Sequence, residues 1–266
     1  MNKPTSIKID AFGLILPAIV LTIWFVSSYL LGVPDYILPA PGKIAAVLLD
    51  FVTGNSNLSF YSGQFLIHSV ASFGRVIEGF LLALLFGLPL GLVTGRFILA
   101  KRIFDPLVHL IRMVPGIGWL PIAMVWFGVG HATTVFLIAL AAFFPIYINS
   151  ALGVSQIPEK LIQAARVLGA KGWALFFHVI LPASAPSILS GMRLALGISW
   201  AYVVLGELTG VSLGLGAVMM NARMLGDTSM IIICMISIAF WGRISDRVLV
   251  AIIRRLHPVK EVSRNE

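Results

Sequence analysis

The sequence predicts an all-α, polytopic membrane protein with six transmembrane helices and one long cytoplasmic loop, as a single domain over residues 1–266. Hydrophobic residues make up 59% of the chain and charged residues only 11%, against roughly a quarter in soluble domains. So much apolar surface exceeds what one water-soluble domain of this length can bury, whereas a bilayer accepts it. The apolar residues also gather in six runs long enough to span a membrane.

The net charge of +8 has the right sign for a nucleic-acid partner, but the placement of the charges argues against one. Basic residues concentrate in every second loop and in the tail, as expected for cytoplasmic segments. They are Arg96, Lys101 and Arg102 before the third run, Lys160, Arg166 and Lys171 before the fifth, and Arg254, Arg255, Lys260 and Arg264 in the tail. The alternation predicts that both termini are cytoplasmic.

The first predicted span, residues 12–31, follows a short start that carries Lys3 and Lys8. Its run of about twenty apolar residues is long enough to cross a bilayer and longer than the apolar core of a signal peptide. The start of the chain also lacks a clear small-x-small cleavage site. We therefore expect these residues to stay in the protein as a helix.

The second predicted span, residues 71–94, has a small residue at every fourth position. These residues are Gly79, Ala83, Gly87, Gly91 and Gly95. Their spacing puts them on one helical face, where the backbone of another helix can approach closely. The pattern favours tight packing inside one subunit over a contact between subunits. Pro89 predicts a kink in this span.

Four further spans are expected at residues 106–127, 133–152, 188–208 and 230–253. A kink is predicted in the third at Pro121. The fifth has its own strip of small residues at Gly191, Ala195 and Ser199.

The sixth span is interrupted by Arg243, Asp246 and Arg247. Spacings of three and four residues place these side chains on one helical face. A pair between Arg243 and Asp246 would offset part of the free-energy cost of charge near the bilayer, so a structural ion pair is favoured over a proton relay. Cys234, the single cysteine, lies in the same apolar run and is expected to be a packing residue.

The segment between the fourth and fifth spans, residues 153–187, is far longer than a simple connection needs. Pro158 and Glu159 suit the first turn of a helix, and Gly169 suits its end. Between them, Leu161, Ala164, Ala165 and Leu168 recur at helical spacing.

A second short helix is expected at residues 173–178, and Pro182 and Pro186 are expected to break the chain before the fifth span. The result would be a compact helix–turn–helix on the cytoplasmic surface. Its apolar stripe would suit either a groove on a partner protein or the headgroup layer of the membrane. Periodicity favours neither interpretation over the other.

Gln163-Ala164-Ala165, then Gly169, then Ile180-Leu181-Pro182 resemble the EAA loop of ABC importer permeases, the inner-membrane components of binding-protein-dependent transport. The family motif has Glu where this chain has Gln163, and here Leu181-Pro182 follows Ile180 directly. Further groups resemble the nitrate, sulfonate and taurine branch of that family. They are Leu38–Pro41, Arg112–Pro115, Leu120–Pro121, Trp126–Gly128, Phe144–Tyr147 and Asn221–Arg223.

The resemblance implies that the loop is a coupling helix that docks in a cleft on an ATPase subunit. The implied coupling residues are Gln163, Ala164, Ala165, Gly169 and Pro182. It also implies a homodimer of this permease, two ATP-binding ABC subunits and a periplasmic or lipid-anchored solute-binding protein, in a bacterial inner membrane. The implied solute is a small anion such as a sulfonate, taurine or nitrate, although pyrimidine vitamin precursors use similar permeases. The residues that contact the solute are not predicted.

No Gly-x-x-x-x-Gly-Lys-Ser/Thr phosphate loop occurs in the sequence, so ATP hydrolysis is expected in another subunit. The five histidines show no metal-ligand spacing, and no catalytic triad can be recognised. We therefore expect neither a cofactor nor an enzyme.

The rival class is an ion-coupled secondary transporter, which places acidic groups at membrane depth. The candidates are Glu78 and Glu207. We expect Glu78 to pair with Arg75, one turn away, and Glu207 to reach water among the headgroups. A membrane scaffold, the third class, would leave the long loop unexplained.

Overall fold

The computed structural model describes residues 11–256, and this range contains helices and connecting loops but no β-strand. The predicted all-α class is therefore confirmed. Two compact units are distinguished: Met1–Leu66 with Val218–Met235, and Ile67–Ala217 with Ile236–Glu266. Each is described separately.

The first unit contains α1 (Ala11–Tyr29) and α2 (Pro41–Thr53). Pro41 stands in the first turn of α2, where the N–H that proline lacks would be unpaired in any case. The indole N–H of Trp24 in α1 donates to the carbonyl of Pro39 at 3.1 Å. This bond ties α1 to the residues that lead into α2.

Asp50, near the end of α2, organises the loop that follows. Its buried carboxylate accepts hydrogen bonds of 2.8–3.2 Å from the hydroxyl of Ser62 and from the backbone N–H groups of Ser56, Leu58 and Ser59. Burial by itself raises the pKa of the Asp50 carboxyl, but these four hydrogen bonds outweigh it, so the pKa lies below its usual value.

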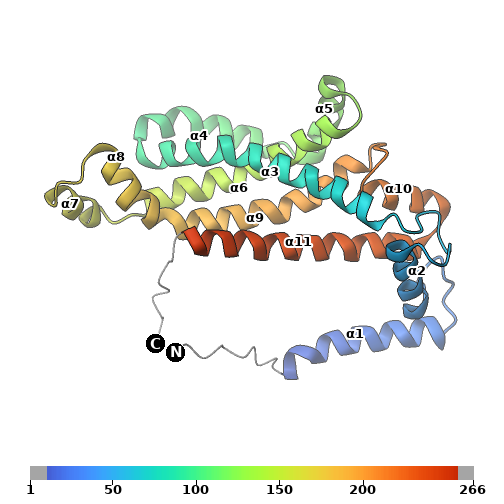
Figure 1. Cartoon of the computed structure of the whole chain (residues 1–266). Helices are drawn as coiled ribbons and strands as arrows, with labels where there is room; N and C mark the ends of the chain where they lie inside the picture. Colours follow the sequence, from blue (N-terminus) through green and yellow to red (C-terminus); the bar gives the residue numbers. More distant parts are fainter. Residues whose placement is uncertain (1–10, 257–266) are drawn as a thin grey trace. The chain divides into compact units, whose positions relative to one another are not determined.

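The second unit is a bundle of long helices with a compact segment at one end (Figure 1). Its elements are α3 (Phe65–Arg96), α4 (Ile98–Met113), a 3₁₀ turn η1 (Gly116–Trp119), α5 (Leu120–Phe127), α6 (His131–Ser155), α7 (Glu159–Val167), α8 (Gly172–Leu175), a π-helical turn η2 (Phe176–Ile180) and α9 (Leu181–Glu207). The helices α10 (Leu215–Leu225) and α11 (Thr228–Leu256) each have residues in both units.

Small residues let α3 and α6 pack closely, as the four-residue spacing predicts. A Cβ added at Gly91 or at Gly95 would lie 2.5 Å from a carbonyl oxygen of α6, that of Tyr147 or of Ala151. The strip on α9 works in the same way, because a Cβ at Gly191 would lie 2.8 Å from the carbonyl oxygen of Pro145. The predicted strips therefore serve packing within the chain.

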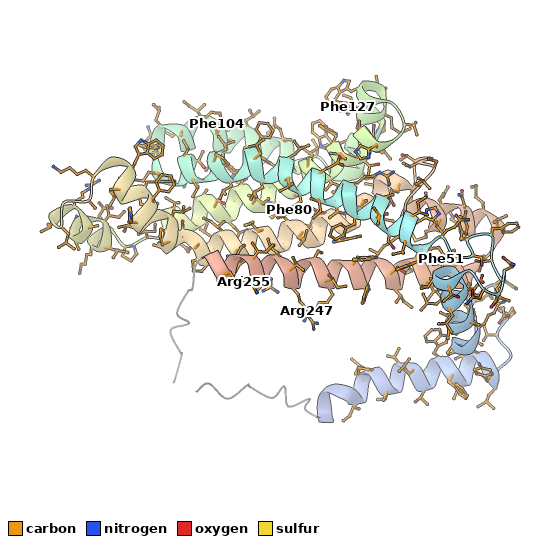
Figure 2. All side chains as sticks on the ribbon, in the orientation of Figure 1. Phe51, Phe80, Phe104, Phe127, Arg247 and Arg255 are labelled. Atoms are coloured by element: carbon orange, nitrogen blue, oxygen red, sulfur yellow. The ribbon has the colours of Figure 1, made fainter. Side chains whose placement is uncertain are left out.

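The core of the second unit lies between α3, α6 and α9 and includes Val76, Phe80, Ile138, Ala142 and Trp200, all buried. Figure 2 shows Phe80 inside the bundle, Phe104 on its outer side and Arg247 of α11 pointing away from it. Many large apolar side chains on the outer faces of the helices are exposed, as expected for a protein whose solvent is lipid.

Four helices of the described chain are long and apolar enough to cross a membrane: Phe65–Arg96, His131–Ser155, Gly172–Glu207 and Thr228–Ile253. A fifth crossing is available if α4 and the η1–α5 pair are counted as one broken span. The first predicted span appears as a shorter apolar helix, Ile15–Tyr29. The structure thus supports four or five of the six predicted spans.

The third predicted span, residues 106–127, is not one helix with a kink at Pro121. α4 begins earlier and ends at Met113, and the chain then turns by 90° before η1 and α5. Val114 is extended, with φ −74° and ψ 119°, because the proline that follows disfavours helical angles in the residue before it.

The start of the fifth span also differs from the prediction. Pro182 and Pro186 do not break the chain before the fifth span, because α8, η2 and α9 run on from Gly172 to Glu207. Pro182 lies directly after the π-helical turn η2, and a local π-helical adjustment lets a helix continue past a proline. Pro89, where a kink is predicted, lies inside α3, which continues to Arg96.

Candidate functional site

The segment from α7 to η2 is the predicted helix–turn–helix. α7 follows Pro158 and has Glu159 in its first turn and Arg166 in its last, an order of charges that suits the helix dipole. Gly169 ends it with φ +89°, and the N–H of Ala170 donates to the carbonyl of Ala165 at 3.0 Å. Only glycine adopts this left-handed angle without strain.

α7 is anchored to the bundle through one face. Ile162 and Ala165 are 5% and 9% exposed. They belong to a cluster of buried residues that also contains Leu92 of α3, Val154 of α6 and Ile188 of α9. The inner face of α7 therefore packs against three of the long helices.

The other face of α7 and the turn after it present apolar side chains to the outside. Val167, Leu168 and Trp173 are 88%, 87% and 76% exposed, and Leu161 is 45% exposed. We call Leu161, Ala164, Val167, Leu168 and Trp173 the exposed tip. Exposed apolar groups in such a cluster suit contact with a partner protein or with the headgroup layer of a membrane.

The five residues assigned to coupling divide between these environments. Gln163 and Ala164 are exposed on α7, and Gly169 forms the turn. Ala165 faces inward, so the predicted stripe of Leu161, Ala164, Ala165 and Leu168 is not one surface. Pro182 is exposed in the first turn of α9.

Sequence analysis missed two residues of this segment. Ile162 is the apolar anchor on the inner face, and its spacing of three from Ala165 was an available signal. Trp173 stacks on Phe177 with ring centroids 5.7 Å apart and so extends the exposed tip. The π-helical turn that holds Phe177 has no recognisable sequence signal.

A second feature is a pocket of about 530 Å³ where the bend after α4 meets α6 and α9. Tyr202 of α9 lies so close to Gly116 that any side chain at that position would require the Tyr202 ring to move. Polar groups in the lining are Arg112, Asn149, Trp119 and Tyr202. Among the described residues, Arg112 is the one charged residue of the lining, and none of the lining residues is acidic.

Glu207 does not reach headgroup water, which corrects the prediction. It is 1% exposed, and its carboxylate accepts hydrogen bonds from Arg75 at 2.5 Å, from the hydroxyl of Ser72 at 2.8 and 2.9 Å, and from the N–H of Gly216 at 2.8 Å. Arg75 also donates to the carbonyl of Leu213 at 2.7 Å. The end of α9 is thereby tied to α3 and to the start of α10.

The predicted pair between Arg75 and Glu78 is therefore wrong. Glu78 instead lies 2.6 Å from the ring Nε2 of His131 at the start of α6, and both side chains are about half exposed. Tertiary packing brings α9 to α3 and decides the partner, which spacing along α3 does not show. Neither glutamate is a free acidic group at membrane depth.

Asp246 of α11 pairs mainly with a residue outside its own helix. Arg193 of α9 reaches both of its carboxylate oxygens, at 2.7 and 3.0 Å, whereas Arg243 is 3.7 Å away. The expected structural ion pair exists, but its main function is to join α9 and α11.

Comparison with known proteins supplies independent findings. The family model of the binding-protein-dependent transport system inner membrane component matches residues 83–258. The chain is 38% identical over 251 residues to a Methanocaldococcus jannaschii protein that bears the name of an ABC transporter permease, covering 92% of each chain. It is 32% identical to the taurine transport system permease protein TauC of Escherichia coli, covering 91% of this chain and 86% of that one.

Among solved structures, the chain resembles one from the inward-facing MetNI methionine ABC transporter. The TM-score is 0.55, and the match covers 70% of this chain and 97% of that chain at 20% identity. At this identity the similarity concerns the fold alone.

Proposed function

This chain belongs to the family of binding-protein-dependent transport system inner membrane components, and on that premise we propose that α7 and the turn after it couple its long helices to a separate ATPase subunit. The chain is the multi-pass, inner-membrane permease subunit of an ABC importer and carries no ATPase activity of its own. The coupling residues are those assigned from the sequence: Gln163, Ala164, Ala165, Gly169 and Pro182.

One observation carries the proposal: α7 is buried on one face, and its other face exposes Leu161, Ala164 and Val167 among polar residues. The exposed tip offers a partner a contact surface, while Ile162 and Ala165 pass any displacement to α3, α6 and α9. Cores resist continuous deformation, so a push on the tip moves these helices together. In this arrangement Gln163 and Ala164 contact the ATPase, while Ala165 holds α7 against the bundle and Gly169 shapes the turn that ends it.

The remaining parts of the importer follow from the same premise. Two copies of this permease form the pathway, two ATPase subunits bind their α7 segments, and a solute-binding protein delivers the solute from outside. Both termini and α7 then face the cytoplasm. ATP binding favours one conformation only if its affinity differs between the inward-facing and outward-facing states.

The coupling proposal is tested by introducing a charged side chain into the exposed tip. Ala164→Glu leaves the buried face of α7 intact, and it places a carboxylate in the apolar contact. We expect the ATPase subunit to be lost on purification of the co-expressed complex, and ATP-driven uptake to stop. Ala45→Glu, the same change at an exposed position of α2, is the control and keeps the ATPase subunit. A complex with Ala164→Glu that assembles and transports normally would contradict the proposal.

The solute proposed is a small anion such as a sulfonate, taurine or nitrate. Arg112 supports this class, because it is the charged group of a pocket with no acidic lining. A guanidinium binds planar or tetrahedral oxyanions through two parallel hydrogen bonds. The relative named for taurine supports the same class.

Arg112→Gln tests the solute class. Hydrogen bonds to charged groups contribute about 1.5–3 kcal/mol, so the apparent KM for taurine uptake should rise about 10- to 100-fold in reconstituted vesicles. Arg102→Gln, an exposed residue of α4 outside the pocket, should leave KM unchanged. Unaltered uptake of every anion by Arg112→Gln would refute this assignment and leave the coupling proposal untouched.

A further inference from the structure

A hollow of about 900 Å³ lies between the end of α3 and the segment from α7 to η2. Its volume is in the range of roughly 300–1,000 Å³ that ligand pockets occupy. None of the five residues proposed for coupling borders this hollow, and of the exposed tip only Trp173 does.

Within the described part of the chain, three cations border the hollow, Arg96, Arg166 and Lys171, and no acidic residue does. Among residues 11–256, none of the three takes part in an ion pair. Arg96 stands in the last turn of α3, where a membrane-crossing helix meets the polar layer of the bilayer. The charge along this border favours a negatively charged occupant.

The wall of the hollow is apolar and follows α3, one of the helices long and apolar enough to cross a membrane. It includes Leu88, Leu92, Val93, Phe97, Trp173 and Ile180. Leu88 is eight residues before Arg96 on α3, which is about 12 Å along a helix at roughly 1.5 Å per residue. A free phosphate ion would leave this wall uncovered, and an acidic peptide would bring polar backbone against it.

We propose that the hollow binds one anionic phospholipid. The headgroup phosphate lies among Arg96, Arg166 and Lys171, and an acyl chain lies along α3 toward Leu88. Because Arg96 belongs to α3 and Arg166 to α7, the headgroup joins the coupling segment to the bundle. Trp173 borders the same space, as indole rings do at the level of lipid headgroups.

Native mass spectrometry of the purified full chain tests the proposal, with phosphatidylglycerol and phosphatidylcholine as the two probes. A basic residue near the surface strengthens anionic lipid binding by roughly fivefold, so removing three weakens it by about 100-fold. We expect the wild-type chain to prefer phosphatidylglycerol, and the variant R96Q/R166Q/K171Q to lose that preference. The control K101Q/R102Q/K160Q removes three exposed cations that do not border the hollow, and it should keep the preference.

A fluorescence measurement covers the case in which the triple variant misfolds. Brominated phosphatidylglycerol should quench tryptophan fluorescence more than brominated phosphatidylcholine, and Trp173→Phe should abolish that difference. Equal loss of lipid preference in both triple variants would overturn the proposal in favour of general surface charge. So would an unchanged preference in R96Q/R166Q/K171Q together with loss of the ATPase subunit, since the cations would then belong to protein docking.

Discussion

Replacing Glu207 by glutamine should strongly destabilise the protein, because it leaves the guanidinium of Arg75 buried without a counter-charge. Arg75 is 6% exposed and Glu207 is 1% exposed, and the two are 2.5 Å apart. Glutamine keeps the shape of the side chain, and its one carbonyl oxygen can still accept hydrogen bonds from Ser72 and Gly216. The substitution therefore removes the charge and the oxygen that accepts from Arg75.

The expected cost is about 3–5 kcal/mol, the range for removing one partner of a buried ion pair. For a chain of this size each kcal/mol corresponds to roughly 2–4 °C, so the melting temperature should fall by about 6–20 °C. The assay is thermal unfolding of the purified chain in detergent, followed by circular dichroism. The double variant R75M/E207M should recover much of this loss, because no charge is then buried alone.

Glu78→Gln is the matched control, since it makes the same chemical change in an exposed pair on α3. Exposed pairs contribute about 0–1 kcal/mol, so the melting temperature should move by at most roughly 4 °C. Equally small changes in melting temperature for Glu207→Gln and Glu78→Gln would refute a stabilising buried ion pair between Arg75 and Glu207. A double variant less stable than Glu207→Gln would refute the explanation by an uncompensated charge.

Three further predictions concern backbone contacts and pH. Gly91→Ala should lower stability by about 1–3 kcal/mol, because the new Cβ would lie 2.5 Å from the carbonyl oxygen of Tyr147. The control is Gly74→Ala, whose new Cβ would have no neighbouring atom within 4 Å. It should be neutral or stabilising in the same thermal unfolding assay. Gly169→Ala should destabilise the turn after α7 by about 1 kcal/mol because of its left-handed angle, which protease sensitivity at this turn would report. The lowered pKa of Asp50 means that its contribution to stability is complete above pH 3.8, the ordinary value, and is lost as pH falls through the lower folded-state pKa. In Asp50→Asn the free energy of unfolding should therefore fall less steeply as the pH is lowered than it does in the wild type. An equally steep fall in both proteins would contradict the hydrogen bonds assigned to Asp50.

Periodicity and turn chemistry were sufficient for much of the fold. The strip from Gly79 to Gly95 predicted the close approach of another helix, and the structure identifies that helix as α6. Gly169 was expected to end a helix, and it does so with a positive φ. These features depend on local spacing, which the sequence displays directly.

Long-range partners were not predictable in the same way. Arg75 lies one turn from Glu78 and 132 residues from Glu207, and only the packing of α9 against α3 decides between them. Asp246 likewise takes Arg193 of α9 in preference to Arg243 of its own helix. The bend at Val114-Pro115 had a local signal, but the continuous apolar character of residues 106–127 masked it.

The sequence predicted some residues of the exposed tip but not which face of α7 packs against the bundle. Helical spacing placed Leu161, Ala164 and Leu168 together on α7, and they are exposed. The same spacing assigned Ala165 to that surface, although it packs inward with Ile162. A short amphipathic helix with apolar residues on both faces does not reveal from sequence which face meets the bundle.

The central claim, that the exposed tip of α7 is where an ATPase subunit engages this permease, is tested most directly by crosslinking. Leu168→Cys, with Cys234 replaced by Ser, should form a crosslink to the ATPase subunit through a short bifunctional thiol- and amine-reactive reagent, and ATP should change its yield. Val125→Cys on α5, which is 82% exposed and lies far from α7 in Figure 1, should form none. Crosslinking of the ATPase subunit at Val125 and not at Leu168 would contradict the account.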